Sequence, residues 1–214
     1  MSTPDPAALL SLVQWLSPAF PTGAFAYSHG LEQAVAVGEV RSEADLADWL
    51  SDILAHGAGW NDAVLLACAL RGEVIAPLAD LARALAGSAE RLRETEEQGA
   101  AFARARAEMT KGAAEALPLP LSLAVAARDL ALPPEQVIAL FLHSFAANLT
   151  SAGVRFIPLG QSAGQRVLAT LHPLIVDLAA RAAAATRADL AQSAFRAELQ
   201  AAAHETLDVR IFKT

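Results

Sequence analysis

Cysteine, tyrosine and charge are scarce in this sequence, and several common site motifs are missing from it. Its 214 residues include one cysteine and one tyrosine. The single cysteine, Cys68, excludes a disulfide within the chain. The sequence contains no Walker A motif of the form G-x-x-x-x-G-K-[ST] and no HExxH. These absences exclude a disulfide-stapled scaffold, nucleotide binding through a Walker A loop, and the metalloprotease class that HExxH marks.

Charged residues make up only 18% of the chain, and the formal net charge is −7. A protein that binds nucleic acid through its phosphates needs a basic face, so this balance argues against a nucleic-acid partner. The most apolar run, residues 137–147, is far shorter than the roughly 20 residues that span a bilayer. The N-terminus shows no pairing of a basic region with an apolar one and a cleavage site. We therefore expect a cytoplasmic protein with neither nucleic acid nor a membrane as partner.

Hydrophobic residues are abundant (54%), whereas aromatic ones are few (6%). Alanine and leucine dominate, and both lose little side-chain freedom in a helix. We expect an all-α protein, a single-domain bundle of roughly eight to ten helices over residues 1–203 with no significant β-sheet. Residues 204–214 are expected to form a C-terminal tail. The surplus of apolar over charged residues predicts self-association.

Local patterns predict where several helices begin. Ser42 and Asp45 form a capping box ahead of an apolar stripe, and Asn61 is expected to cap the next helix. The Pro-Pro-Glu sequence at 133–135 is typical of a helix start. It leads into the apolar run 137–147, which we expect at the centre of the bundle.

Two further helices are expected from charge and composition. One covers residues 88–116, and the Glu and Arg side chains crowding its first turns are expected to lie mostly on a solvated face. The other covers residues 189–203 and precedes the tail.

The stretch SPAFPTGAFAYSHGLEQAV, residues 17–35, places the only tyrosine, Tyr27, at an irregular corner. Gly30 falls within the helix that the following apolar residues imply, where glycine costs about 1 kcal/mol relative to alanine. We therefore expect another part of the chain to pack closely against the Gly30 backbone. Two interpretations of Tyr27 and His29 stay open: ordinary half-buried packing residues with satisfied hydrogen bonds, or part of a functional surface.

A second irregular stretch is GVRFIPLGQSAGQRVL, residues 153–168. Pro158 and Gly160 predict a turn, and Ser162 with Gln165 predicts a capping box that opens a helix. A glycine-bearing loop before a helix N-terminus is able to hold an anion. A capped helix start with solvated glutamines is the alternative.

The tail, HETLDVRIFKT, is the third irregular stretch. No periodicity would bury His204, Glu205, Arg210 or Phe212, so we expect the tail to be mobile when free. The five histidines of the chain show no metal-ligand spacing between neighbours, and no acid–base pair stands out. The residues alone therefore identify no catalytic, cofactor-binding or metal-binding residue.

Two other classes of protein are alternatives on these observations. A helical hydrolase would use His29 or His204 with a nearby carboxylate, and it predicts a concave pocket with perturbed titratable groups around that histidine. A ligand-binding regulatory bundle would need an enclosed apolar cavity and usually a basic helix that reads DNA. The acidic balance of the chain counts against the second alternative.

The three irregular stretches, in this order, resemble the urease accessory protein UreF family. SPAFPTGAFAYSHGLE is similar to that family's early signature, PLGQSAGQRVL to its second, and HETLDVRIF to its C-terminal tail. RETEEQG at 93–99 is a weaker fourth similarity. Each stretch alone is unremarkable, but their joint occurrence on a helical chain of this length is specific, and it covers essentially the whole chain.

The resemblance implies an all-helical homodimer that catalyses no reaction itself and acts in the cytoplasm during maturation of urease, a nickel enzyme. It implies a bridge between a partner called UreD (also UreH) and the GTPase UreG, with the assembly docking on apo-urease. In this role the chain would couple GTP hydrolysis by UreG to nickel delivery and would modulate the GTPase. No stably bound cofactor is implied, and nickel would pass through the complex transiently.

The resemblance also assigns partner-binding roles to individual residues. These residues are Tyr27, Gly30, Glu32, Gln161, Gln165, His204, Glu205, Arg210 and Phe212. Arg210 would be the charged anchor of the tail on UreD. Leu207 and Asp208 depart from the polar and aromatic residues common in the family's tail, so no aromatic contact is expected there. Tyr27 would lie on surface shared with another chain, where its rigid ring and polar tip offer a grip.

Overall fold

The computed structural model describes residues 5–213, and within them the chain forms ten α-helices and three short 3₁₀ helices with no strand. The α-helices are α1 (Pro6–Trp15), α2 (Leu31–Ala36), α3 (Glu43–His56), α4 (Ala58–Leu70), α5 (Ile75–Ala84), α6 (Ala89–Thr110), α7 (Leu119–Ala127), α8 (Pro134–Phe156), α9 (Gln161–Ala184) and α10 (Phe195–His204). The 3₁₀ helices are η1 (Ala24–Ala26), η2 (Arg128–Leu130) and η3 (Arg187–Asp189). The prediction of an all-α bundle is confirmed.

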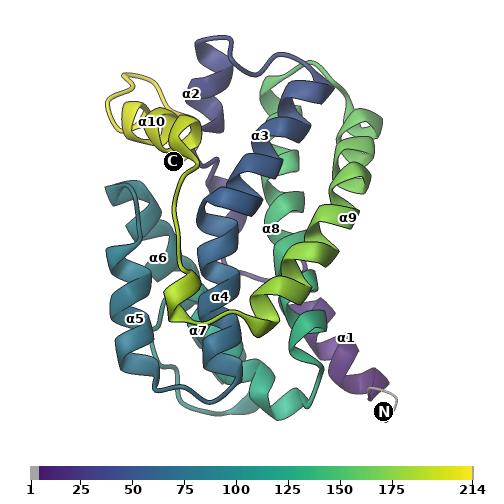
Figure 1. The fold of residues 1–214 in the computed structure, drawn as a ribbon, viewed down its shortest axis with the longest axis vertical. Coiled ribbons are helices and arrows are strands. Elements are labelled where there is room, and N and C mark those ends of the chain that lie inside the picture. The colour runs from purple at the N-terminus through teal and green to yellow at the C-terminus, as the bar shows by residue number, and fades with distance from the viewer. Residues whose placement is uncertain (1–4, 214) are drawn as a thin grey trace.

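Helix α4 forms the centre of the bundle. Every residue from Gly59 to Ala69 is buried, because α3, α7, α8 and α9 all pack around this helix. Figure 1 shows α8 and α9 as a long antiparallel pair on one side of the molecule and α5 on the other. The expectation that the run 137–147 lies at the centre is wrong. Helix α8 buries one face there, whereas Leu140 and His143 are only half-buried.

Two predicted helix starts are confirmed. Ser42 caps α3: its hydroxyl accepts a hydrogen bond from the Asp45 amide, and the Asp45 carboxylate accepts one from the Ser42 amide. Helix α8 begins at Pro134, whose fixed backbone angle suits the first helical position. In both cases the residues that predict the helix start lie within one turn of it, so local chemistry decides where the helix begins.

Other predicted boundaries are wrong, each for a tertiary reason. Asn61 lies inside α4, which starts at Ala58, and its Oδ1 accepts a hydrogen bond from the distant Ala191 amide at 3.0 Å. Helix α9 starts after Gly160 without a side-chain cap, so Ser162 is not its cap. The predicted last helix splits into η3 and α10, which starts at Phe195.

Three helical stretches are long and apolar enough to cross a membrane by length and composition alone, namely 43–70, 134–156 and 161–184. Within the most apolar window of each, 78%, 50% and 39% of the residues are buried inside this fold. The apolar run 137–147 is therefore part of a longer helix, and its length does not argue against a membrane. That the chain has no membrane partner stays a prediction.

Gly30 brings α10 into direct contact with the start of α2. The residue is the N-cap of α2 rather than an interior position, and its φ of +74° lies in the left-handed region that favours glycine. A Cβ atom built on Gly30 would lie 2.5 Å from the backbone nitrogen of Ala201 in α10. The predicted close approach of another backbone is thus present, and it joins the corner to the last helix.

Replacing Gly30 with alanine should destabilise the protein more than the same change at Gly23. Both glycines have almost the same left-handed φ, +74° and +77°, but nothing lies within 4 Å of a Cβ built on Gly23. The two variants therefore share the backbone cost, and only Gly30→Ala must push α10 away, at a further cost of about 2 kcal/mol. Urea unfolding of both variants measures the difference. Equal free energies of unfolding would show that α10 yields without cost.

Candidate functional site

A row of glutamates on α6 carries the candidate site. Glu90, Glu94 and Glu97 follow one another at spacings of four and three residues, which places them on one face of a helix. Glu90 and Glu94 are only 3% and 4% exposed. A buried carboxylate is very costly unless it is paired and hydrogen-bonded. The expectation that this charged run is mostly a solvated face is therefore wrong for Glu90 and Glu94.

The corner at residues 27–32 supplies partners to this row. His29 Nε2 lies 2.8 Å from Glu94 Oε2, and the Tyr27 hydroxyl donates to Glu97 Oε2 at 2.6 Å. His29 has a φ of 52°, a left-handed conformation that is uncommon for a non-glycine residue. It also packs edge-on against Phe145 of α8, with ring centroids 4.9 Å apart. The strained backbone conformation of His29 thus places its side chain against Glu94.

Glu94 has further donors on its own helix. Arg91 donates to Glu94 Oε2 at 3.2 Å and Gln98 donates to Glu94 Oε1 at 2.8 Å. Arg91 also donates to Asp62 of α4 at 2.5 Å. Burial alone would raise the pKa of Glu94, but His29 and Arg91 outweigh it and hold the pKa below its usual value. Glu94 is therefore a charged group fixed from three directions.

His204, at the end of α10, joins the tail to the corner and to α6. The residue is fully buried, with Nδ1 2.9 Å from Glu90 Oε2 and Nε2 3.0 Å from Glu32 Oε2. A neutral imidazole donates from only one of its nitrogens. The geometry therefore requires either an imidazolium between two carboxylates or a proton on one of the carboxyl groups.

Glu32 anchors the backbone of the tail. Its two carboxylate oxygens accept hydrogen bonds from the Ile211 and Phe212 amides, both at 2.9 Å. Burial alone would raise the pKa of Glu32, but the Phe212 amide, His204 and the Ile211 amide lower it further than burial raises it. The Phe212 side chain is 4% exposed and packs on Phe156 of α8, with ring centroids 5.1 Å apart.

The charged side chains of the tail complete the row. Arg210 donates to Glu90 Oε1 at 2.6 Å, and Lys213 donates to Glu97 Oε2 at 2.7 Å. Glu205 accepts from the Ala89 amide at 2.8 Å and so caps the N-terminus of α6. We call the cluster formed by Tyr27, His29, Glu32, Glu90, Glu94, Glu97, His204, Arg210 and Lys213 the tail clasp.

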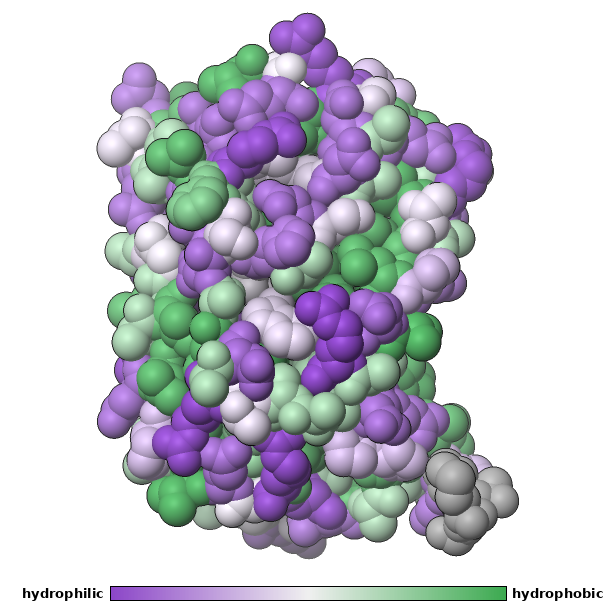
Figure 2. Space-filling model, in the orientation of Figure 1, coloured by the Kyte–Doolittle hydropathy of each residue, from purple (hydrophilic) through white to green (hydrophobic). Residues whose placement is uncertain are grey.

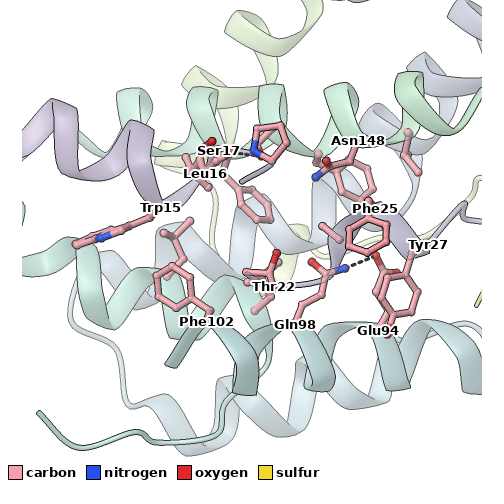
Figure 3. Close-up of a pocket in the computed structure, with 18 of the residues that line it drawn as sticks. Trp15, Leu16, Ser17, Thr22, Phe25, Tyr27, Glu94, Gln98, Phe102 and Asn148 are labelled. Atoms are coloured by element: carbon pink, nitrogen blue, oxygen red, sulfur yellow. Dashed lines mark hydrogen bonds between the residues drawn. The ribbon is translucent and has the colours of Figure 1, made fainter. Parts of the chain in front are cut away.

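A cavity of about 60 Å³ adjoins the tail clasp. Figure 3 shows Glu94 and Gln98 pointing toward each other at one end of it, with Trp15 and Phe102 at the other. Burial and the nearby Glu97 carboxylate raise the pKa of Tyr27, which also lines the cavity, so this hydroxyl stays protonated. The volume holds a few water molecules and no larger ligand. The hydrolase alternative predicts a substrate pocket at His29, and the space beside His29 is too small for one in this conformation.

The structure separates the predicted site residues into two groups. Tyr27, Gly30, Glu32, His204 and Phe212 are buried within the chain, whereas Gln161, Gln165, Glu205 and Arg210 are exposed. The expectation that Tyr27 lies on shared surface is wrong for the single chain, because its ring is 2% exposed. The Tyr27 hydroxyl, which we expected to contact a partner, donates a hydrogen bond to Glu97 instead.

The tail also differs from the expectation that nothing would bury it. His204 and Phe212 are buried because carboxylates and an aromatic ring from distant parts of the chain surround them. Arg210 and Glu205 keep solvent exposure while binding α6. The mobility of the free tail stays a prediction.

The second irregular stretch lies close to the tail clasp without being part of it. Helix α8 ends at Phe156, which contacts Phe212, and α9 begins five residues later at Gln161. Gly164 allows the two helices to approach, since a Cβ there would lie 2.6 Å from a methyl carbon of Val154. Gln161 and Gln165 point outward, in agreement with the interpretation of solvated glutamines. Figure 1 shows α2, α10 and the turn between α8 and α9 in the same half of the molecule.

Glu32→Gln should release the end of the tail. The amide that replaces the carboxylate keeps one acceptor and presents an NH₂ group to a backbone donor, so we expect a loss of about 2–3 kcal/mol in the free energy of unfolding. Hydrogen exchange at the Ile211 and Phe212 amides should accelerate strongly. Glu43→Gln is the matched control, because it breaks a two-bond pair with Arg166 on the surface and should change neither quantity measurably. Unchanged protection of both amides in Glu32→Gln would refute the anchoring role.

Comparisons with known proteins agree with this arrangement. A model of the UreF family matches residues 40–172. The urease accessory protein UreF of Cereibacter sphaeroides is 62% identical over 208 residues, which cover 97% of this chain and 99% of that protein. The proteins of the same name from Paracoccus denitrificans and Dinoroseobacter shibae are 51% and 48% identical, covering 99% and 97% of this chain and 98% and 99% of their own lengths. The chain therefore belongs to the UreF family of urease accessory proteins.

Proposed function

We propose that the protein is a non-catalytic scaffold for urease maturation, which binds UreD (UreH) and the GTPase UreG and docks with them on apo-urease. In this proposal the chain works as a cytoplasmic homodimer. It couples GTP hydrolysis by UreG to nickel delivery and modulates that hydrolysis without binding nucleotide itself. Nickel is the cargo, passing through the complex with no cofactor bound stably, and neither nucleic acid nor a membrane takes part.

Family membership and the tail clasp together support the proposal. The corner, α6 and the tail carry three of the four stretches that resemble the family. These three parts meet at one cluster, held by His–Glu pairs and a tyrosine hydrogen bond across more than 60 residues of sequence. The remaining stretch, PLGQSAGQRVL, contains the start of α9 beside them. A scaffold needs such a rigid region, because a surface that is ordered before binding loses less entropy in the complex.

The surface around the tail clasp has the composition of an interface. Phe195 and Leu199, four residues apart on α10, are 67% and 69% exposed, and Val209 and Ile211 of the tail are 81% and 75% exposed. Figure 2 shows a few hydrophobic side chains among hydrophilic ones on the surface at the place of α10 in Figure 1. Large exposed apolar side chains with a polar rim are typical of protein-binding sites. We assign this surface, with Arg210 and Glu205 at its rim, to UreD.

The predicted site residues differ in exposure, and the proposal gives different roles to the buried and the exposed ones. The buried residues Tyr27, Glu32 and His204 hold the tail in place and act on a partner only through it. Gln161 and Gln165 are exposed at the start of α9 and are available to a second partner or to the second subunit. The proposal therefore places direct partner contact at Gln161, Gln165, Glu205 and Arg210.

The proposal is tested by light scattering on a size-exclusion column, with the chain alone and then with UreD, UreG and GTP. The expected result is a dimer that moves into a larger complex containing all three chains. A monomer that ignores both partners would overturn the scaffold role, and assays of the isolated chain for hydrolysis would follow.

Arg210→Ala should weaken UreD binding while leaving the fold and the dimer intact. The arginine is partly exposed, and His204 continues to satisfy Glu90 when the guanidinium is removed. We expect a loss of at least about tenfold in affinity, as for an interface anchor. Arg187→Ala is the control, since Arg187 is a similarly exposed arginine paired with Glu73 far from the tail. Equal UreD affinity of the two variants would remove Arg210 from the interface.

A further inference from the structure

Two histidines that are distant in sequence face each other on the outer side of the long helix pair. His143 is on α8 and His172 is on α9, and their ring centroids lie 5.4 Å apart with the ring planes inclined by 41°. His143 is half-buried and His172 is exposed, so both are reachable from solvent. Neither residue belongs to the tail clasp or to the stretches that resemble the family.

We propose that His143 and His172 together bind a divalent transition-metal ion of the class that prefers imidazole ligands, such as Ni²⁺. In a metal–imidazole bond the nitrogen lies about 2.1 Å from the metal, and the ring centre lies about 1 Å beyond that nitrogen. Two such rings at a tetrahedral angle have centres about 5 Å apart. The observed separation of the two rings is close to this value.

The ligand chemistry of the pair selects the class of metal. A neutral imidazole nitrogen is the form that binds a metal. Imidazole suits nickel, copper and zinc, whereas magnesium and calcium prefer oxygen ligands.

The site is open, which makes it suited to a cargo ion rather than a structural one. Among residues 5–213 no group of three or more His, Cys, Asp or Glu side chains is placed to hold a metal. The remaining coordination positions are therefore left to water or to a donor from another chain. An ion held by two protein ligands exchanges readily, in contrast to one in a closed four-ligand site. A part for this site in nickel handling rests on the proposed function, but metal binding by the pair does not.

The test is a titration of the untagged chain with nickel sulfate, followed by calorimetry and by the side-chain NMR signals of the histidines. We expect one site per chain, paramagnetic broadening of the ring signals of His143 and His172 together, and a melting temperature that rises with Ni²⁺. His143→Gln and His172→Gln should each weaken binding by at least about tenfold. His56→Gln removes an exposed histidine from another helix and serves as the matched control.

Circular dichroism shows whether each variant is folded before it is titrated, and magnesium chloride serves as the control ion. Broadening of only one ring, or equal Ni²⁺ affinity in His143→Gln, His172→Gln and the control, would overturn the proposal. Because the titration uses the chain alone, its failure would leave the scaffold role untouched. Conversely, a chain that binds Ni²⁺ but ignores UreD and UreG would keep the metal site and refute the scaffold.

Discussion

The burial of glutamates on α6 is the constraint on which this end of the molecule depends. Glu90 and Glu94 are almost inaccessible to solvent, and such groups stay charged only when donors surround them. Helix α6 itself supplies two donors to Glu94, Arg91 and Gln98, and the rest must come from elsewhere. The corner and the tail are therefore required by α6, and their ordered placement follows from the cost of leaving a carboxylate unpaired.

Shared partners make the corner, α6 and the tail a single unit. His204 binds Glu32 and Glu90 at once, so the imidazole cannot leave without exposing two buried acids to each other. Gly30 adds a steric link, because it lets the α10 backbone lie directly against the start of α2. A protein that binds the tail where it lies finds this surface already assembled. A partner that displaces the tail must provide new hydrogen-bond donors for Glu32 and Glu90. This requirement restricts which partners are able to displace the tail.

Composition and local chemistry predict the fold class well but the site poorly. The Ala- and Leu-rich chain and the Ser42 capping box need only short-range information, and both predictions are confirmed. Asn61 has good capping chemistry, but its side chain binds an amide 130 residues away instead. The glutamates of α6 look solvated because their partners are far along the chain, 114 residues away for Glu90 and His204. Their spacing of four and three residues was the available signal that they share a face.

The same limit explains why resemblance alone does not define a binding surface. A motif marks residues under constraint, and here the constraint on Tyr27, Glu32 and His204 is satisfied inside one chain. Exposed positions of the same motifs, such as Gln165 and Arg210, have no comparable internal requirement, although Arg210 makes one ion pair with Glu90. Mutating the buried residues would weaken partner binding by displacing the tail. Mutating the exposed residues would weaken it by removing a direct contact. Only a structure separates these two causes, because sequence similarity scores both in the same way.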